Sequence, residues 1–334
     1  MTDSTPSGSP LDAVASGGES QVADTFSLLG NETRLAILLV LWEARDPETM
    51  TGTLPFSRLR DRVGLPRGRQ FNYHLEKLVG TFVEKTDDGY GLRFPGLLFV
   101  RSIIAGGGID DPTLERTQID VRCEICGAPT AVSYDDNRLT LYCTECEGRC
   151  PPSQDCPSGA LMGGHLEPAG LAHRTAEELF SAFMVKIFAS KFYELGGICS
   201  NCTAPIETSL EVCEDHDGSD SELCAVCNHS SPAIWRTHCA TCKVSKAGPP
   251  RWLALFHPAV VAFYYDHGME IGLGGRTDEA DILRYLELSW TFETEALSVE
   301  PPRIQVTVSR DGDHRHLVLD GTGAVIDVTD GTAA

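Results

Sequence analysis

The residues most able to do chemistry in this chain are six pairs of metal-ligand side chains, and the two members of each pair are separated by two residues. Two such ligands on one tight turn supply half of a tetrahedral zinc site, so two pairs complete it. Six pairs therefore predict three zinc ions with a structural role, because four protein ligands leave no position for water or substrate. The pairs are Cys123/Cys126, Cys143/Cys146, Cys199/Cys202, Cys213/His216, Cys224/Cys227 and Cys239/Cys242.

The first four cysteines predict a zinc ribbon, because the alternating segments 132–134 and 139–141 form a hairpin between their two pairs. The later four pairs can combine in two ways. Ten residues separate Cys202 from Cys213, and eleven separate Cys227 from Cys239. These intervals favour a sequential arrangement, in which the first and second pairs bind one zinc ion and the third and fourth pairs bind another. A crossed arrangement would instead join first with third and second with fourth. His216 is either a zinc ligand or a solvated loop histidine. Its two-residue separation from Cys213 favours the ligand.

Two further cysteines, Cys150 and Cys156, are five residues apart, a spacing that suits no common zinc turn. They are either unpaired thiols or a redox pair that reports oxidation.

Outside the metal modules, the N-terminal region shows a series of helix signals. An apolar helical pattern runs over 24–44, with Asn31 as the expected N-cap of a helix from Glu32. Helices over 56–63 and about 67–79 flank the Gly64-Leu65-Pro66 turn, and a hairpin follows around Asp87-Asp88-Gly89. This order predicts a winged helix-turn-helix.

The charge distribution points to a nucleic-acid partner for this region. The whole chain has a net charge of −21, which repels polyanions. Between Pro55 and Gly80, however, six basic residues face only two acidic ones. The helix over 67–79 would then lie in the major groove of double-stranded DNA, with its first side chains at the base edges. A solvated basic helix, or a winged helix that contacts protein, is the alternative.

The candidate DNA-contacting residues fall into three groups. The base-reading candidates are Arg67, Arg69, Gln70, Asn72 and Tyr73. The phosphate-binding candidates are Arg58, Arg60, Arg62 and Lys77. The candidates on the hairpin wing are Lys85, Tyr90 and Arg93, and a solvated wing is the alternative.

The segment Leu29-Gly30-Asn31-Glu32-Thr33-Arg34-Leu35-Ala36-Ile37-Leu38, together with His74-Leu75-x2-Leu78, resembles the ArsR-like winged-helix regulators. The likeness covers about residues 24–95 and is particularly to the larger haloarchaeal type with C-terminal zinc-ribbon modules. It implies a homodimer on a two-fold-related operator. Metal-sensing members carry cysteines in the helix before the recognition helix, and residues 57–63 have none, so this chain is not expected to sense arsenic in that way.

The composition indicates a cytoplasmic protein adapted to high salt. Only six of the 27 basic residues are lysines, and acidic residues number 48, a surface composition that resists salting-out. Residues 1–22 lack the basic start and apolar stretch of an export signal, and no apolar run approaches the roughly 20 residues needed to span a membrane.

The expected fold class is α+β, with a winged helix-turn-helix, zinc ribbons, linking helices and a small terminal β-sheet. The expected parts are a disordered tail (1–22), the DNA-binding domain (23–107), the four-cysteine ribbon (118–150), a linker (151–172) and a C-terminal module (173–334). That module contains a long helix capped by Thr175, the two-zinc block (197–244) and the sheet.

No catalytic motif is recognisable, so an enzyme is not expected. The leading hypothesis is a sequence-specific DNA-binding transcriptional regulator, and the sequence does not show whether it has a small-molecule effector. The alternative is a zinc-ribbon scaffold that binds protein or RNA, and a third hypothesis is a metal- or redox-responsive switch.

Overall fold

The computed structural model describes residues 27–49, 51–64, 68–106, 112–149, 157–218, 223–271 and 279–332, and the chain divides into two compact units, 1–110 and 111–334. All four sheets in the described part are antiparallel and alternate with helices, so the predicted α+β class is confirmed. None of the described helices is long and apolar enough to cross a membrane.

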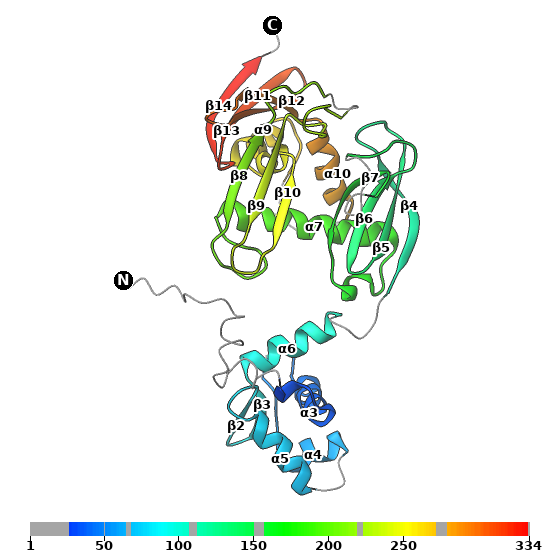
Figure 1. Ribbon diagram of the computed structural model, residues 1–334, viewed down its shortest axis with the longest axis vertical. Helices are drawn as coiled ribbons and strands as arrows, with labels where there is room; N and C mark the ends of the chain where they lie inside the picture. Colours follow the sequence, from blue (N-terminus) through cyan, green and yellow to red (C-terminus); the bar gives the residue numbers. More distant parts are fainter. Residues whose placement is uncertain are drawn as a thin grey trace, which may run out of the picture. The chain divides into compact units, whose positions relative to one another are not determined.

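The N-terminal unit places three helices and a short strand before a β-hairpin (Figure 1). Its antiparallel sheet has the strand order β1–β3–β2. The predicted N-cap is confirmed, since Asn31 Oδ1 accepts a hydrogen bond from the Arg34 N–H at 3.2 Å. The elements are α3 (Glu32–Glu43), β1 (Thr53–Leu54), α4 (Phe56–Val63), α5 (Gly68–Leu78), β2 (Val83–Thr86), β3 (Gly89–Leu92) and α6 (Phe94–Ile104).

One face of α5 builds the core of this unit. Phe71, Leu75 and Leu78 follow helical spacing and are almost completely buried, together with Ile37 and Leu41 of α3. Burial of each such side chain stabilises the unit by roughly 1.5–3 kcal/mol. The opposite face of α5 is therefore left for solvent or a partner.

The C-terminal unit contains three sheets and the long helix α7, and their buried side chains form one core. Figure 1 shows α7 running from the β4–β7 sheet to the β8–β10 sheet, with α10 near it. The elements are β4 (Leu114–Arg122), β5 (Pro129–Asp135), β6 (Arg138–Cys143), β7 (Ala160–His165), a 3-10 turn (Pro168–Leu171), α7 (Ala176–Leu195), β8 (Glu207–Val212), β9 (Ala233–His238), β10 (Ser245–Gly248), α8 (Arg251–Ala254), α9 (Pro258–Asp266), α10 (Glu279–Trp290), β11 (Glu293–Ser298), β12 (Arg303–Arg310), β13 (Asp313–Asp320) and β14 (Val325–Thr332).

The predicted cap of α7 is confirmed, and it is a complete capping box. Thr175 Oγ1 accepts from the Glu178 N–H at 3.2 Å, and the Glu178 carboxylate accepts from the Thr175 N–H at 2.6 Å. Buried Phe180, Phe183 and Phe188 then project from α7 into the core that the three sheets share.

The linker predicted over 151–172 is wrong for residues 160–165, which form edge strand β7. Gly163 and Gly164 gave this segment the composition of a loop. In the structure they permit close packing, because a Cβ on Gly163 would lie 3.0 Å from the Leu139 carbonyl oxygen and one on Gly164 would lie 3.1 Å from the Phe183 ring. Cys150 and Cys156 lie outside the described residues.

Candidate metal centres and nucleic-acid interface

The first four cysteines converge at one end of the β4–β7 sheet. Cys123 and Cys126 lie on the turn between β4 and β5, while Cys143 ends β6 and Cys146 follows it. The sulfur atoms of Cys123 and Cys146 are 3.7 Å apart, and those of Cys126 and Cys143 are 3.4 Å apart. Zn–S bonds of about 2.3 Å in a tetrahedron place sulfurs about 3.8 Å apart, so the group fits a bound zinc ion.

Two more groups of four ligands lie at opposite ends of the β8–β9 hairpin. One consists of Cys199, Cys202, Cys239 and Cys242, and the other of Cys213, His216, Cys224 and Cys227. In each group all ligand atoms lie within 4.8 Å of one another. All twelve predicted ligands are thus gathered into three groups that could hold metal ions.

The pairing within residues 199–242 is nested, so both the sequential and the crossed arrangements are wrong. Strands β8 and β9 are antiparallel, with Glu207 opposite His238 and Val212 opposite Ala233. The turn before β8 therefore meets the turn after β9, and the turn after β8 meets the turn before β9. Six paired residues at about 3.3 Å each separate the two centres by on the order of 20 Å.

Four of the six ligand turns share one backbone conformation. The residue after the second ligand is left-handed in each, and its N–H donates to the carbonyl of the first ligand at 2.8–2.9 Å. Three of these residues are not glycine, and a left-handed non-glycine residue costs on the order of 1 kcal/mol. Repeated strain at these turns is consistent with a bound ion holding them. The four residues are Gly127, Thr203, Asn228 and Lys243.

Backbone and side-chain donors favour the thiolate form of two ligands, Cys143 and Cys242, whereas burial raises the pKa of Cys123 and of Cys146. Burial opposes ionisation of Cys143, but the N–H groups of Cys146 and Glu145, 3.2 and 3.3 Å from its sulfur, help to hold its pKa at about 7. A hydrogen bond from the Asn201 side chain, supported by the Val244 N–H, lowers the pKa of Cys242 to about 6. Thiolate is the ligand form that zinc requires.

A salt-bridge network, not anticipated from the sequence, joins the first metal group to α8. The Glu124 carboxylate, on the turn between Cys123 and Cys126, binds the guanidinium of Arg149 and lies 2.6 Å from Arg251 Nη2. Arg251 opens α8, which follows the last strand of the β8–β10 sheet. The side chains of Glu124 and Arg251 are about one-tenth exposed.

A second buried network surrounds Lys191 of α7. Its Nζ lies 2.8 Å from the Glu194 carboxylate and 3.8 Å from the centre of the Trp235 ring. Glu194 also accepts from Lys246 at 2.9 Å, and Lys246 contacts the Ser200 hydroxyl on the turn that carries Cys199 and Cys202. Spacing in the sequence gives no sign of this burial.

This buried lysine makes stability depend on pH in the alkaline range. Burial lowers the pKa of Lys191 from 10.5 to about 8, although Glu194 opposes the shift. Between these values the unfolded chain keeps a proton that the folded chain has released, so stability of the C-terminal unit is expected to rise with pH from about 8 to 10.5. The gain is on the order of 3 kcal/mol. Urea unfolding at several pH values measures it, and Lys191→Met should flatten the rise.

The candidate DNA-contacting residues of the N-terminal unit differ in their exposure to solvent and in whether they already contact other side chains. Arg58, Arg69, Gln70 and Tyr73 are exposed, and within the described part of the chain neither Arg58 nor Arg69 has an ion-pair partner. Tyr73 has 57% of its surface exposed on α5. Arg67 lies outside the described residues.

Other candidates already have contacts inside their own unit. Arg60 pairs with Asp61 at 2.7 Å and Arg62 with Glu43 at 2.8 Å, while the Asn72 amide donates to Glu76 at 2.7 Å. Surface ion pairs are worth about 0–1 kcal/mol, so a phosphate could replace these partners at small cost. Lys77 and Lys85 each lie 5.9 Å from the centre of a tyrosine ring, and Arg93 is exposed before α6.

Comparison with known families matches both parts of the chain. Residues 120–325 match the family described as domain of unknown function (DUF7351), and residues 22–103 match domain of unknown function (DUF7347). No curated protein and no solved structure matches the chain.

Proposed function

The chain belongs to the family of the domain of unknown function DUF7351, and we propose that it is a sequence-specific DNA-binding transcriptional regulator with three structural zinc ions. In this proposal the N-terminal unit is a winged helix-turn-helix that resembles the ArsR-like regulators. Helix α5 is the recognition helix and the β2–β3 hairpin is the wing. The protein would work in a cytoplasm of high salt.

The observation that carries the proposal is the free basic face at the start of α5. Arg69 and Gln70 are exposed in its first turn, opposite the buried Phe71 and Leu75. Arginine can hold guanine through two hydrogen bonds, and glutamine can do the same with adenine. Residues 27–106 carry eleven basic and nine acidic side chains, so the acidity of the chain belongs mainly to the other unit.

Zinc is the proposed ion for all three groups. Tetrahedral sets of four thiolates, or of three thiolates and one imidazole, suit zinc, and each set is closed by protein ligands. Each ion would fix turns that the small hairpins alone hold weakly. Zinc would have a structural role in these groups, and the hydrogen-bond donors beside Cys143 and Cys242 would orient their thiolates.

The homodimer implied by the resemblance has a candidate surface on α6. Phe94, Leu98 and Ile104 are exposed by 66%, 50% and 46% on this helix. Phe94 and Leu98 are four residues apart and share one face of α6, and exposed apolar side chains on one face favour contact with a second copy. Dimerisation would also raise affinity for a two-fold-related operator in high salt, where phosphate contacts weaken.

The test is Arg69→Ala, with selection of genomic fragments by gel shift in high potassium chloride. Loss of a two-hydrogen-bond contact to a base costs about 1–3 kcal/mol, so preference for the selected fragment should fall about 5- to 150-fold. Zinc content and helix content should stay unchanged, since Arg69 is exposed. Arg138→Ala, exposed at the start of β6 in the C-terminal unit, removes the same charge and should keep the preference.

The alternative function, a zinc-ribbon scaffold that binds protein or RNA, gives a different result. The wild-type chain would then retain no preferred fragment. The pairing of Arg60 and Arg62 within the unit is the observation that favours this alternative.

A further inference from the structure

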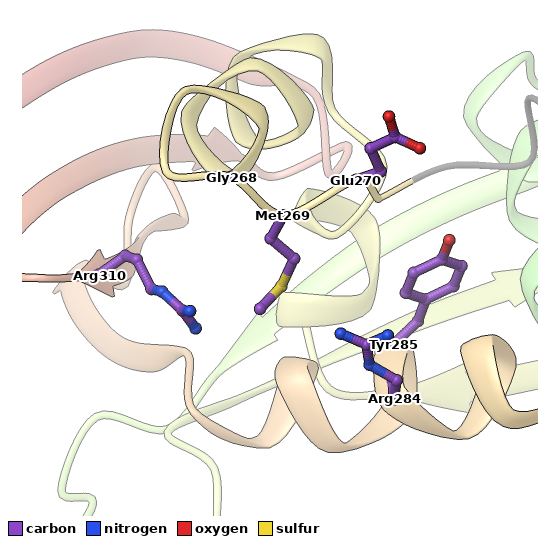
Figure 2. A pocket seen from close by; sticks show the side chains of 6 residues that line it. All are labelled: Gly268, Met269, Glu270, Arg284, Tyr285 and Arg310. Atoms are coloured by element: carbon purple, nitrogen blue, oxygen red, sulfur yellow. The ribbon is translucent and has the colours of Figure 1, made fainter.

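A cavity of about 360 Å³ lies in the C-terminal unit, where the segment after α9, the middle of α10 and the end of β12 meet. Its volume falls in the range of small-molecule sites, roughly 300–1,000 Å³. Figure 2 shows its lining, which consists of Gly268, Met269, Glu270, Arg284, Tyr285 and Arg310. None of these residues belongs to the metal groups or to the candidate DNA interface.

Two positive charges are directed into this cavity from different elements. Figure 2 shows the guanidinium groups of Arg284 and Arg310 pointing toward each other below Met269. The carboxylate of Glu270 points away from both. Two guanidinium groups directed into one cavity give it a positive potential that attracts a small anion.

Arg310 also has an unmet hydrogen-bonding capacity. Its Nε is buried and has no hydrogen-bond partner in the described part of the chain. The carboxylate of Asp311 is 3.6 Å away, beyond hydrogen-bond distance, and is 69% exposed. The Arg310 side chain is 39% exposed and forms an ion pair with Asp311, but its buried Nε keeps the capacity to donate a hydrogen bond to an acceptor in the cavity.

The lining selects the kind of acceptor. A guanidinium is a planar fork that matches the two oxygens of a phosphate or a carboxylate. The lining is mainly polar, and Met269 adds a small apolar surface beside the two arginines, which suits an anion with a short organic part. We propose that this cavity binds a small organic anion, with its phosphate or carboxylate group held between Arg284 and Arg310.

The experiment is calorimetric titration of the zinc-loaded full chain with inorganic phosphate and, separately, with succinate, at fixed potassium chloride concentration. At least one probe should bind saturably, and the stronger of the two identifies the anionic group. Arg310→Gln and Arg284→Gln should each weaken that binding at least tenfold. The matched control is Arg303→Gln, at the other end of β12, which should leave it unchanged. DNA is not needed, so failure of the proposed regulatory function would not affect the result.

Three results would overturn the proposal. They are absence of saturable binding with both probes, binding that survives both cavity variants, and equal weakening in Arg303→Gln. Should a glutamine variant fail to fold, Arg310→Lys keeps the charge without the planar fork, and binding by that variant equal to wild type would count against the site. Far-ultraviolet circular dichroism establishes folding before each titration.

Discussion

A chain with both Cys199→Ala and Cys239→Ala is expected to retain two zinc ions. These cysteines come from different turns, but the β8–β9 hairpin brings them into one metal group. Removing both cysteines therefore abolishes one zinc site only. The ligand groups at the other end of the hairpin and on the β4–β7 sheet stay complete. Zinc content per chain, measured by mass spectrometry of the purified protein, gives the count.

The matched control is Cys199→Ala with Cys224→Ala, which removes ligands from two groups and should leave one ion. Sequential pairing would leave one ion in both double variants. Crossed pairing would leave one ion in the first variant and two in the second. The two counts together thus separate all three arrangements, and any pair of values other than two and one contradicts the nested structure.

The effect on stability should be equally large. Structural zinc binds zinc-finger peptides with about 10–16 kcal/mol, as much as the whole stability of a typical domain, about 5–15 kcal/mol. If a double variant unfolds, cysteine alkylation of the wild-type chain during slow chelation provides a second measurement. Cys199, Cys202, Cys239 and Cys242 should become reactive together, separately from Cys213, Cys224 and Cys227.

The metal ligands could be predicted from the sequence because each pair lies on one local turn. Two ligands separated by two residues are close in space whatever the rest of the chain does. The pairing of turns could not be predicted, because it depends on which strands become neighbours. Only the register of β8 against β9, with Glu207 opposite His238, decides it.

Helix ends were predictable for the same local reason. Asn31 and Thr175 cap α3 and α7 through side-chain contacts within three residues, so their signals are contiguous. Strand β7 was missed, since its glycines serve contacts with β6 and with Phe183 of α7. The cavity between Arg284 and Arg310 was invisible for a related reason, as its lining comes from three separate segments.

Charges were the least predictable feature, because burial and distant partners decide their role. From the sequence alone, Arg62 and Arg69 are equally good candidates for contact with DNA. In the structure, however, Arg62 forms an ion pair with Glu43 of α3. Lys186 and Lys191 also look alike in the sequence, five residues apart on α7. In the structure one is exposed and the other is almost completely buried.

Glu194→Gln is therefore expected to destabilise the C-terminal unit by about 3–5 kcal/mol, because it removes the carboxylate that Lys191 needs while that lysine stays buried. The side chains of Lys191 and Glu194 are 4% and 2% exposed, and water cannot replace the lost partner. Lys246, the second cation on Glu194, loses its ion pair in the same variant.

The fold supplies its own matched control in Lys186 and Glu167. Their separation is 2.7 Å, against 2.8 Å for the buried pair, but their side chains are 42% and 48% exposed. Glu167→Gln should therefore cost no more than about 1 kcal/mol. Urea unfolding in a Trp42→Phe background compares the two, because the remaining tryptophans (Trp235, Trp252 and Trp290) all report on the C-terminal unit. Equal losses in the two variants would show that burial does not set the energy of the Lys191 pair. A Lys191→Met/Glu194→Gln double variant should recover most of the loss, since it leaves no buried charge on α7 without a partner.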